Sequence, residues 1–389
     1  MSHESHEKLR NAVRDLLPGI AARGAEIEKA RRLPLDLIDQ LKAAGVFRMF
    51  VPESHGGLGV DIRVGMDILE AIARADGSAG WTAMIGSESP HLLALLPRDR
   101  FDAIYAAGPD VIIGGGFNAQ GEAHVVEGGY RATGRWNFAS GCEHAEWLLG
   151  NCVVMQDGKP RPGPAEGMPE VRAMLFKKDD CRVIDTWNVL GLRGTGSHDI
   201  AAEDVFCPND RTFDIFGGAP SVPGPGFIAP VLHFVLHLGA VGVGIAQGAL
   251  DDMVGVVNSG KKRLYARASL GESPVFQVHL GRADMNVRAA RAFMRSTADE
   301  LWAACSTDPA SVAAMAPRIS AAAAWVTEAA CAAVDACYRA GGGGAARDSS
   351  PLQRRFRDIH TLSQHAALAE GWLGQAGAGL LGQPTGFFT

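Results

Sequence analysis

The sequence predicts an α+β protein of several domains, with a helical N-terminal domain, a middle antiparallel β domain and a C-terminal four-helix bundle. In the first part of the chain apolar residues recur at helical spacing, for example at Leu37, Ile38 and Leu41. Short β-rich runs separated by turn residues begin near Val111, and long helical patterns return after Pro230. We therefore expect domains at residues 1–110, 111–212 and 213–389.

The middle region holds short runs rich in β-forming residues, which we expect to be strands at 111–113, 123–126, 130–138, 147–155, 171–176, 182–188 and 200–206. Between the first two runs, the segment 116–123 begins with glycine and carries a second glycine, which indicates a turn. Proline and glycine dominate two further segments, 157–169 and 217–226, which we expect to be loops.

The last part of the chain shows long helical patterns at 230–259, 274–305, 310–340 and 352–381. The stretch 227–250 contains no charged residue and is long enough to cross a bilayer. It also contains a proline, two histidines, a glutamine and four glycines, and polar groups of this kind are costly in an isolated span. We therefore expect a helix that is buried inside the bundle.

The composition is that of a globular enzyme. A chain of 389 residues with 47% hydrophobic content can bury a large core, and its net charge of −6 with interspersed signs argues against a nucleic-acid-binding surface. The seven cysteines form no C-x-x-C pair, which argues against a disulfide framework or a zinc cluster. The N-terminus is polar and lacks a secretory signal, so we expect a cytoplasmic protein with no membrane span.

The segment 128–147 carries the most specific signal. It sets the hydroxyl of Ser140 in a turn between two β-patterned runs, beside the aromatic residues Trp136 and Phe138. Together with the segment 116–123 and the helical segment 357–365, this pattern resembles the two-component (group D) flavin-dependent monooxygenases built on the acyl-CoA dehydrogenase fold. The segments 191–199 and 203–208 also look like the closing strand pair of that superfamily's β domain.

The resemblance implies a flavin site lined by Phe117, Asn118, Trp136, Phe138 and Ser140, although one of the aromatics Trp136 and Phe138 is expected in the β-domain core. Arg267-Ala-Ser-Leu-Gly271, followed by Gln277, resembles the Arg-x-x-Phe-Gly motif of the superfamily. In that motif the arginine reaches the phosphates of the flavin nucleotide, often across a subunit boundary. Here a leucine replaces the aromatic residue, and Gln277 stands one position early.

The glycines Gly341, Gly342 and Gly343, followed by Pro351 and by Arg354-Arg-Phe-Arg-Asp358, resemble the turn and helix start that approach the flavin in the same superfamily. Glycines leave backbone amides open to a phosphate or a ring edge. The alternative is a flexible loop between two helices.

Acyl-CoA dehydrogenases need a carboxylate that removes a proton from the substrate, and the sequence supplies none where that family has one. The first family position falls at about Ala366, beside His365, and no Asp or Glu lies between Asp214 and Asp251. Glu370 remains as a displaced base, one turn further along. This absence argues against acyl-CoA oxidation.

Histidine stands where the carboxylate is missing, and it exchanges protons near neutral pH. The resemblance favours His365 as the group that positions or deprotonates the substrate, with His360 as the competitor on the same segment. It also implies that Ser140 bonds flavin N5 and protects a C4a-hydroperoxyflavin, whereas an ordinary turn serine bonds its own backbone. His91 falls where related monooxygenases place a histidine that contacts the substrate, or else it lies on the surface.

Two further patterns give negative expectations. His233 and His237 lie four residues apart on one helix face, but no glutamate follows the first, so we expect pocket or core histidines and no metal site. The glycines 114–116 follow a β run but open no helix, so a dinucleotide-binding fingerprint is absent. Reduced flavin is therefore expected to arrive from a separate NAD(P)H:flavin reductase.

We therefore expect the oxygenase component of a flavin monooxygenase, which uses reduced FMN or FAD and O2 to hydroxylate a small phenolic or indolic substrate. The resemblance also implies a homotetramer. The alternatives are an acyl-CoA dehydrogenase or oxidase, an amino-sugar N-hydroxylase on the same fold, and a non-catalytic flavin-binding subunit.

Overall fold

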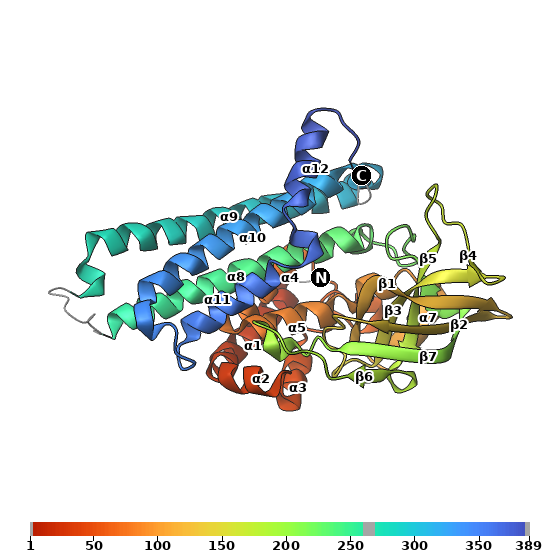
Figure 1. Cartoon of the computed structure of the whole chain (residues 1–389), viewed down its shortest axis with the longest axis horizontal. Coiled ribbons are helices and arrows are strands. Elements are labelled where there is room, and N and C mark those ends of the chain that lie inside the picture. The colour runs from red at the N-terminus through yellow and green to blue at the C-terminus, as the bar shows by residue number, and fades with distance from the viewer. Residues whose placement is uncertain (1–2, 260–268, 386–389) are drawn as a thin grey trace.

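The computed structural model describes residues 3–259 and 269–385 and has the three expected parts (Figure 1). The N-terminal part is helical and consists of α1 (His3–Ala22), α2 (Gly24–Ala30), α3 (Leu35–Ala44), α4 (Ile62–Ala75), α5 (Gly77–Ser87), α6 (Ser89–Leu93) and α7 (Arg98–Tyr105). The carboxylate of Asp76 accepts the backbone N–H of Ala79 and caps the start of α5. This cap fixes where α5 begins, and α5 carries Trp81 and Ile85 toward the middle domain.

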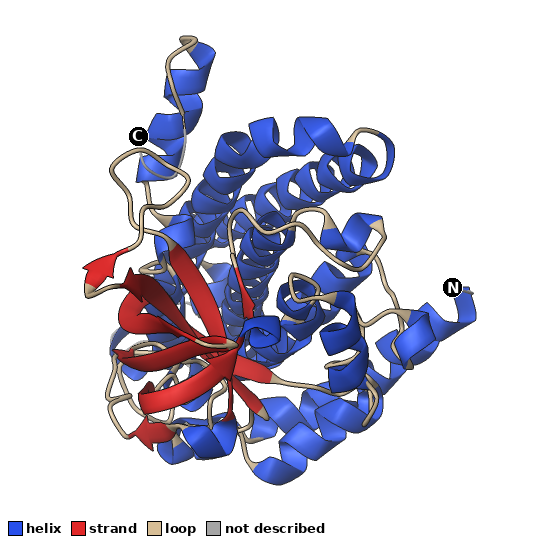
Figure 2. Cartoon of the chain, turned by 90° about the vertical axis from the view of Figure 1, so that its right-hand side faces the viewer, coloured by secondary structure: helices blue, strands red, loops and turns tan. Residues whose placement is uncertain are grey.

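The middle part is one sheet with the strand order β6-β7-β2-β1-β3-β5-β8, in which β4 pairs with β3. Its strands are β1 (Ile113–Val126), β2 (Gly129–Trp136), β3 (Trp147–Gln156), β4 (Lys159–Pro160), β5 (Val171–Lys177), β6 (Arg182–Ile184), β7 (Asp199–Pro208) and β8 (Thr212–Phe213). The expectation of a purely antiparallel domain is wrong, because β1 and β3 pair in parallel and the sheet is mixed. Figure 2 shows this sheet beside the helices.

The turn expected at 116–123 is also wrong, because β1 runs through it. The register of β1 on β3 shifts between Gly116 and Ala119 and again between Ala119 and Gly121, so the strand is irregular there but unbroken. The glycines are required by close packing and not by a turn. A Cβ at Gly121 would lie 2.4 Å from the indole of Trp136, and one at Gly116 would lie 2.9 Å from the Cβ of Trp136.

The C-terminal part is a bundle of long helices, which are α8 (Pro230–Asn258), α9 (Pro274–Thr307), α10 (Val312–Gly341) and α11 (Pro351–Leu362). The helix expected at 352–381 is interrupted, because α11 ends at Leu362 and α12 (Gly371–Leu380) follows as a separate helix. His365 has an extended backbone in this interruption, with φ −68° and ψ 132°. In Figure 2, α12 projects from the rest of the molecule.

The long apolar helix α8 is the buried centre of the bundle, as expected. Within the described residues, α8 and the stretch Pro309–Gly344 are long and apolar enough to span a membrane, and 83% of the apolar window of α8 is buried inside the protein. Two glycines let α8 approach α4 closely. A Cβ at Gly244 would lie 2.4 Å from the carbonyl oxygen of Glu70, and one at Gly248 would lie 2.6 Å from that of Arg74.

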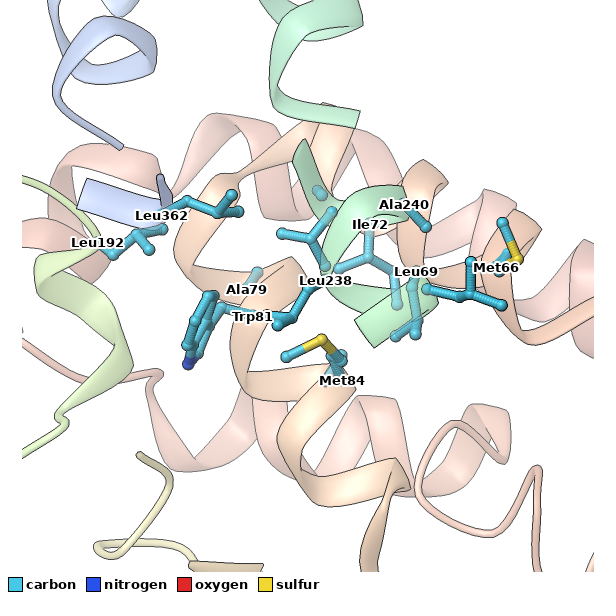
Figure 3. Packing of buried hydrophobic residues seen from close by; sticks show 14 of the residues in the cluster. Met66, Leu69, Ile72, Ala79, Trp81, Met84, Leu192, Leu238, Ala240 and Leu362 are labelled. Carbon is cyan, nitrogen blue, oxygen red and sulfur yellow. The ribbon is translucent and has the colours of Figure 1, made fainter. Parts of the chain in front are cut away.

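Buried apolar side chains from all three parts share one large cluster, and a second, smaller cluster joins α6 and α7 to the sheet and to the segment before α8. Figure 3 shows part of the large cluster, where Trp81 from α5 lies near Leu192 from the middle domain and Leu362 from α11, with its indole nitrogen at the edge of the cluster. The first connection follows α7 and the second lies between β8 and α8, so the proposed boundary at 212 falls inside β8. We keep 1–110, 111–212 and 213–389 as the proposed domains. The core therefore joins the parts where the candidate site lies.

Candidate active site

Ser140 lies in a tight turn that follows β2. Phe138 has a positive φ of 59° and Gly141 one of 74°, and the backbone N–H of Ala139 donates to the carbonyl of His198. The Ser140 side chain is buried. Its Oγ accepts the indole N–H of Trp81 at 3.0 Å and lies 2.7 Å from Oγ of Ser197. The turn thus brings helix α5 and the segment before β7 together.

The direction of these hydroxyl hydrogen bonds follows from counting protons. Thr195 Oγ1 donates its proton to the carbonyl oxygen of Leu192 at 2.9 Å, so it accepts in its 2.7 Å contact with Ser197. The Ser197 proton is then used on Thr195, and Ser140 donates to Ser197. Because Trp81 occupies one lone pair of Ser140, one lone pair remains to accept a further N–H or O–H group.

His365 lies against the same tryptophan. Its ring centroid is 5.8 Å from that of Trp81 and 5.6 Å from that of Phe234 on α8. Nδ1 of His365 accepts the backbone N–H of Ala367 at 3.2 Å, which places the proton of the neutral ring on Nε2. Burial lowers the pKa of His365 to about 4. The ring is therefore neutral near pH 7 and is suited to donate a hydrogen bond from Nε2 rather than to take up a proton.

His360, the other candidate on this segment, faces the bundle. Its Nε2 lies 2.8 Å from Oδ1 of Asp335 on α10, and its ring packs on Phe356. Of the two histidines, His365 is therefore the one that lies beside Trp81 and Ser140.

A cavity opens beside this group. Side chains from the α5–α6 region, β1, β3 and the start of α8 line it, and they are mostly apolar: Ile85, Glu88, Ser89, His91, Leu92, Ile113, Gly114, Gly115, Phe117, Leu149, Pro230, Val231 and Phe234. Phe234 lies between the cavity and His365, and its ring centroid is 6.0 Å from that of Phe117. The cavity therefore adjoins the Trp81–Ser140 group.

At another part of its wall the cavity meets a buried cluster of one carboxylate and two histidines. Glu88 Oε2 lies 2.6 Å from Nδ1 of His91, and Glu88 Oε1 bonds Nδ1 of His237 on α8. Burial alone would raise the pKa of the Glu88 carboxyl, but the charges and hydrogen bonds of His237 and His91 hold that pKa well below its usual range. Glu88 is therefore a carboxylate that only accepts hydrogen bonds.

The proton positions in this cluster follow from the carboxylate. Because Glu88 only accepts, both His91 and His237 carry a proton on Nδ1. The Nε2 atoms of His233 and His237 are fully buried without a hydrogen-bond partner. Nε2 of His91 also has no hydrogen-bond partner among the described residues. His91 lines the cavity, and its Nε2 is the ring nitrogen that the contact with Glu88 leaves free.

The second pair of histidines, His233 and His237, lies in the core beside the Glu88 cluster. His237 bonds within the core through Glu88, and burial lowers the pKa of His233 well below its ordinary value, with the neighbouring His91 and His237 adding to this effect. Within the described residues, no group of three or more His, Cys, Asp or Glu side chains could hold a metal ion.

Comparisons with known proteins agree with this geometry. Residues 3–94 match the N-terminal domain of acyl-CoA dehydrogenases, and residues 236–370 match the C-terminal domain. An indole-3-acetate monooxygenase of Pseudomonas putida is 35% identical over 98% of this chain and 94% of its own length. The oxygenase subunit HsaA of a flavin-dependent monooxygenase from Rhodococcus jostii is 33% identical over 90% of this chain and 92% of its own.

Among solved structures, XiaF from Streptomyces sp. in complex with FADH2 and glycerol matches with a TM-score of 0.88 and 25% identity, over 98% of this chain and 96% of that chain. The chain belongs to the flavin-dependent monooxygenases of the acyl-CoA dehydrogenase superfamily. This monooxygenase is an oxygenase component and uses reduced flavin, so its site must accommodate a flavin ring.

The residues around Ser140 in this monooxygenase fit such a ring. Phe138 is 61% exposed and presents an apolar face 6.2 Å from the ring of Trp187. Next to it, Oδ1 of Asn137 is buried without a hydrogen-bond partner. A flat apolar surface, a free lone pair on Ser140 and an unpaired acceptor suit a ring that carries N–H groups.

The irregular part of β1 borders this surface. A Cβ at Gly116 would lie 3.0 Å from the carbonyl oxygen of Asn137, so Phe117 and Asn118 follow directly beside the Ser140 turn. Asn118 is exposed, and Phe117 lines the cavity. Both stay predictions as flavin contacts.

The expectation that Trp136 flanks the flavin is wrong. The Trp136 side chain is fully buried inside the β domain, where its N–H donates to the carbonyl of Asn151 at 2.7 Å and its ring lies 5.7 Å from Phe176. No surface of this ring remains for a cofactor. Trp136 is the aromatic of the pair that belongs to the core, and Phe138 is the one that is exposed.

Two expected cofactor contacts lie away from Ser140 or cannot be placed. Arg267 lies outside the described residues. Gly341 ends α10, Gly342 has a positive φ of 59°, and Gly343 follows in the turn that leads to α11. This turn precedes α11 and His365 follows it, so the two lie at opposite ends of that helix. Gly341, Gly342 and Gly343 therefore cannot share the Ser140 surface within one subunit, and their role stays a prediction.

The two places considered for an acyl-CoA dehydrogenase base near His365 do not face the cavity. Ala366 and Glu370 are both exposed, and Glu370 lies at the start of α12. Glu88 is the carboxylate that lines the cavity, and both of its oxygens are held by histidines.

Sequence reasoning missed several residues of the site, namely Trp81, Glu88, Ser197 and Phe234. Glu88 stands three residues before His91, a spacing that could have suggested an ion pair. No local pattern links Trp81 to Ser140 or Phe234 to His365, because each contact joins segments that are far apart in the chain.

Proposed function

We propose that this monooxygenase hydroxylates a small aromatic substrate that carries an O–H or N–H group, such as a phenol or an indole. The observation that supports this most is the cavity, which is lined mostly by apolar side chains, has His91 in its wall and adjoins the Ser140 surface. An aromatic ring fits the apolar walls, and its one polar group finds a hydrogen-bond partner in His91. The relative that acts on indole-3-acetate is consistent with this substrate class.

Each residue of the site has a proposed task. Nε2 of His91 accepts the O–H or N–H of the substrate and holds the ring in one orientation. Ser140 accepts an N–H of the flavin, while Phe138 packs on the flavin ring. His365 donates from Nε2 toward the place where flavin and substrate meet. Reduced flavin supplies the activation of O2 when it is bound there.

The apolar walls keep water from this place. Phe117, Phe234 and Leu149 come from three different elements and cover the cavity between the Ser140 group and His91. Exclusion of water protects an activated oxygen species from hydrolysis and from loss as peroxide.

The proposed partners are a separate NAD(P)H:flavin reductase and other copies of this chain. The helix α9 exposes Val275, Val278, Met285 and Phe293, and Phe293 lies 5.6 Å from the exposed ring of Trp325 on α10. Such a row of apolar side chains on the outside of a bundle suits burial against a second copy, and supports a homotetramer. All seven cysteines are unpaired, which suits the proposed cytoplasmic location.

The test is a single-turnover reaction. The protein is mixed anaerobically with reduced FMN or FAD and then with buffer that contains ¹⁸O2 and either indole-3-acetate or phenol. We expect a hydroxylated product that contains one ¹⁸O atom. If every aromatic compound tested yields only hydrogen peroxide, the proposal is wrong.

Two alternatives have distinct outcomes in the same system. An acyl-CoA dehydrogenase would bleach oxidised flavin when butyryl-CoA is added, and we expect no bleaching because the carboxylate beside His365 is missing. An amino-sugar N-hydroxylase would turn over a nucleotide sugar, which the apolar lining of the cavity does not favour.

A further inference from the structure

The Glu88 cluster is more elaborate than a single hydrogen bond to His91 requires. Glu88 stands at the junction of α5 and α6, and its side chain reaches two histidines that are far apart in the sequence. Phe50 closes the cluster, since its ring centroid lies 4.9 Å from that of His91 and 4.9 Å from that of His237. The carboxylate is thus shared by an imidazole that lines the cavity and one that is wholly buried.

We propose that Glu88 and His237 are positioning residues for His91: the carboxylate fixes the proton of His91 on Nδ1, and His237 limits how strongly that carboxylate favours the protonated form of His91. This inference rests on the proposed function in one respect, the contact between His91 and the substrate. The assignment of the protons does not depend on it.

The first half of the proposal follows from the acceptor character of Glu88. Without a carboxylate at Nδ1, the proton of neutral His91 could reside on either nitrogen, and a proton on Nε2 would leave no lone pair for the substrate. Glu88 removes this choice, because the 2.6 Å contact requires a donor at Nδ1.

The second half concerns charge. A carboxylate within about 4–6 Å raises the pKa of an imidazole by roughly 1–3 units, because it stabilises the charged form. A protonated His91 would carry a hydrogen on Nε2 and could not accept a hydrogen bond from the substrate. His237 occupies the second oxygen of Glu88 and shares its negative charge. Under this proposal the Nδ1 proton of His91 stays directed at Glu88, while Nε2 remains available to the substrate.

The other described groups around His91 carry no charge that would change its protonation, so Glu88 and His237 are the groups that set it. His233 lies perpendicular to His91 at 5.2 Å, and burial lowers its pKa so that it stays neutral. Phe50 and Phe227 contact the remaining faces of His91. Among the described residues that line the cavity, those from β1, β3 and α8 contribute no charged group.

The test measures the titration of His91 directly in the full-length protein without flavin. Histidine labelled with ¹³C at Cε1 is incorporated, and the variant His91→Gln assigns the signal. Glu88→Gln keeps the shape of the side chain but removes the charge, so the titration midpoint of His91 should move to lower pH by about 1–2 units. His237→Leu leaves the whole charge of Glu88 to His91, so the midpoint should move to higher pH by roughly 1 unit.

Matched controls separate this effect from a loss of structure. His237→Asn keeps an N–H donor near the position of Nδ1 and should move the midpoint less than His237→Leu. Asp102→Asn removes a carboxylate from His55, whose Nε2 lies 2.8 Å from it outside the cavity, and should leave the His91 signal unchanged. The melting temperature of each variant shows whether it folds.

Shifts in opposite directions for Glu88→Gln and His237→Leu support the proposal. Shifts in the same direction, or no shift in folded variants, overturn it. Because the titration needs neither flavin nor turnover, a failure to hydroxylate any aromatic substrate would refute the proposed function and leave this result standing.

Discussion

The site contains two histidines that use the same side chain in opposite ways. His91 has a carboxylate at Nδ1 and keeps a lone pair on Nε2, whereas His365 receives a backbone N–H at Nδ1 and carries its proton on Nε2. His91 is therefore an acceptor toward the cavity and His365 a donor. The hydrogen-bond partner of Nδ1, and not the residue type, therefore decides whether Nε2 of each imidazole accepts or donates a hydrogen bond.

The largest effect is expected for the acceptor. His91→Phe keeps an aromatic ring but removes Nε2, so the substrate loses the hydrogen-bond acceptor that we assign to it. We expect the amount of hydroxylated product to fall by about 100-fold, which is a typical effect of losing a positioned acid–base group. Chromatography of single-turnover mixtures measures the product. Product formation at the wild-type level would show that His91 has no part in holding the substrate.

The next effect concerns Ser140, which lies beside the donor. Ser140→Ala removes the lone pair that we assign to a flavin N–H, so the near-ultraviolet absorbance formed after mixing reduced flavin with O2 should decay about 10-fold faster, the loss of roughly one hydrogen bond. Stopped-flow absorbance measures the decay.

Trp81→Phe is the matched control for Ser140, because it removes the N–H that donates to Ser140 but keeps that hydroxyl. It should shorten the lifetime less than Ser140→Ala does. An equal or larger effect of Trp81→Phe would assign the protection to Trp81.

A smaller effect is expected for His365, since a donor orients the reactants without taking up a proton. His365→Ala should retain reaction with O2 and lose roughly half or more of the product, with hydrogen peroxide making up the difference. Because burial lowers the pKa of His365 to about 4, this ring stays neutral above about pH 5. The loss of product in the variant should therefore be the same at pH 6 and pH 8. A loss of product at only one of these two pH values would contradict the donor role.

The smallest effect is expected for Asp358. It tests whether hydrogen-bond partners or burial decide the charge of a buried carboxyl group. Asp358 is buried like Glu88 but has no histidine partner, and burial together with the charge of Asp76 raises its pKa to about 7. The folded state therefore favours the protonated form, and the stability that this form contributes is lost as the pH rises through about 7. Asp358→Asn should raise the melting temperature relative to the wild type by a few degrees more at pH 8 than at pH 5.

A constant difference in melting temperature between pH 5 and pH 8 would show that Asp358 does not titrate in this range. The variant keeps an oxygen that can accept the N–H of Leu192, which bonds Oδ1 of Asp358 at 2.6 Å, so loss of that contact is not the cause of the change.

Much of the fold could be predicted, because helical and β periodicity are local properties of the sequence. The long helix α8 is an example, since its apolar residues and glycines already indicate burial in a bundle. The parallel pairing of β1 and β3 could not be predicted, because it depends on which strands meet after folding. The strand through 116–123 was missed since its glycines serve the packing of Trp136 and look like turn residues.

The site was predictable only where a family pattern marked it. Ser140, His91 and His365 were singled out by resemblance, and the structure brings Ser140 and His365 to the same tryptophan. Their proton positions could not be predicted, because they depend on Glu88, Thr195 and the backbone of Ala367, which carry no motif. The error at Trp136 has the same origin, since alternation along a strand does not say which aromatic faces the interior.

The most direct test of the contrast between the two histidines is the ¹⁵N chemical shift of their ring nitrogens at pH 7.5. The His91→Gln and His365→Ala variants assign the signals. We predict that the proton of neutral His91 resides on Nδ1 and that of His365 on Nε2. If both rings carry the proton on the same nitrogen, the assignment of one acceptor and one donor is contradicted.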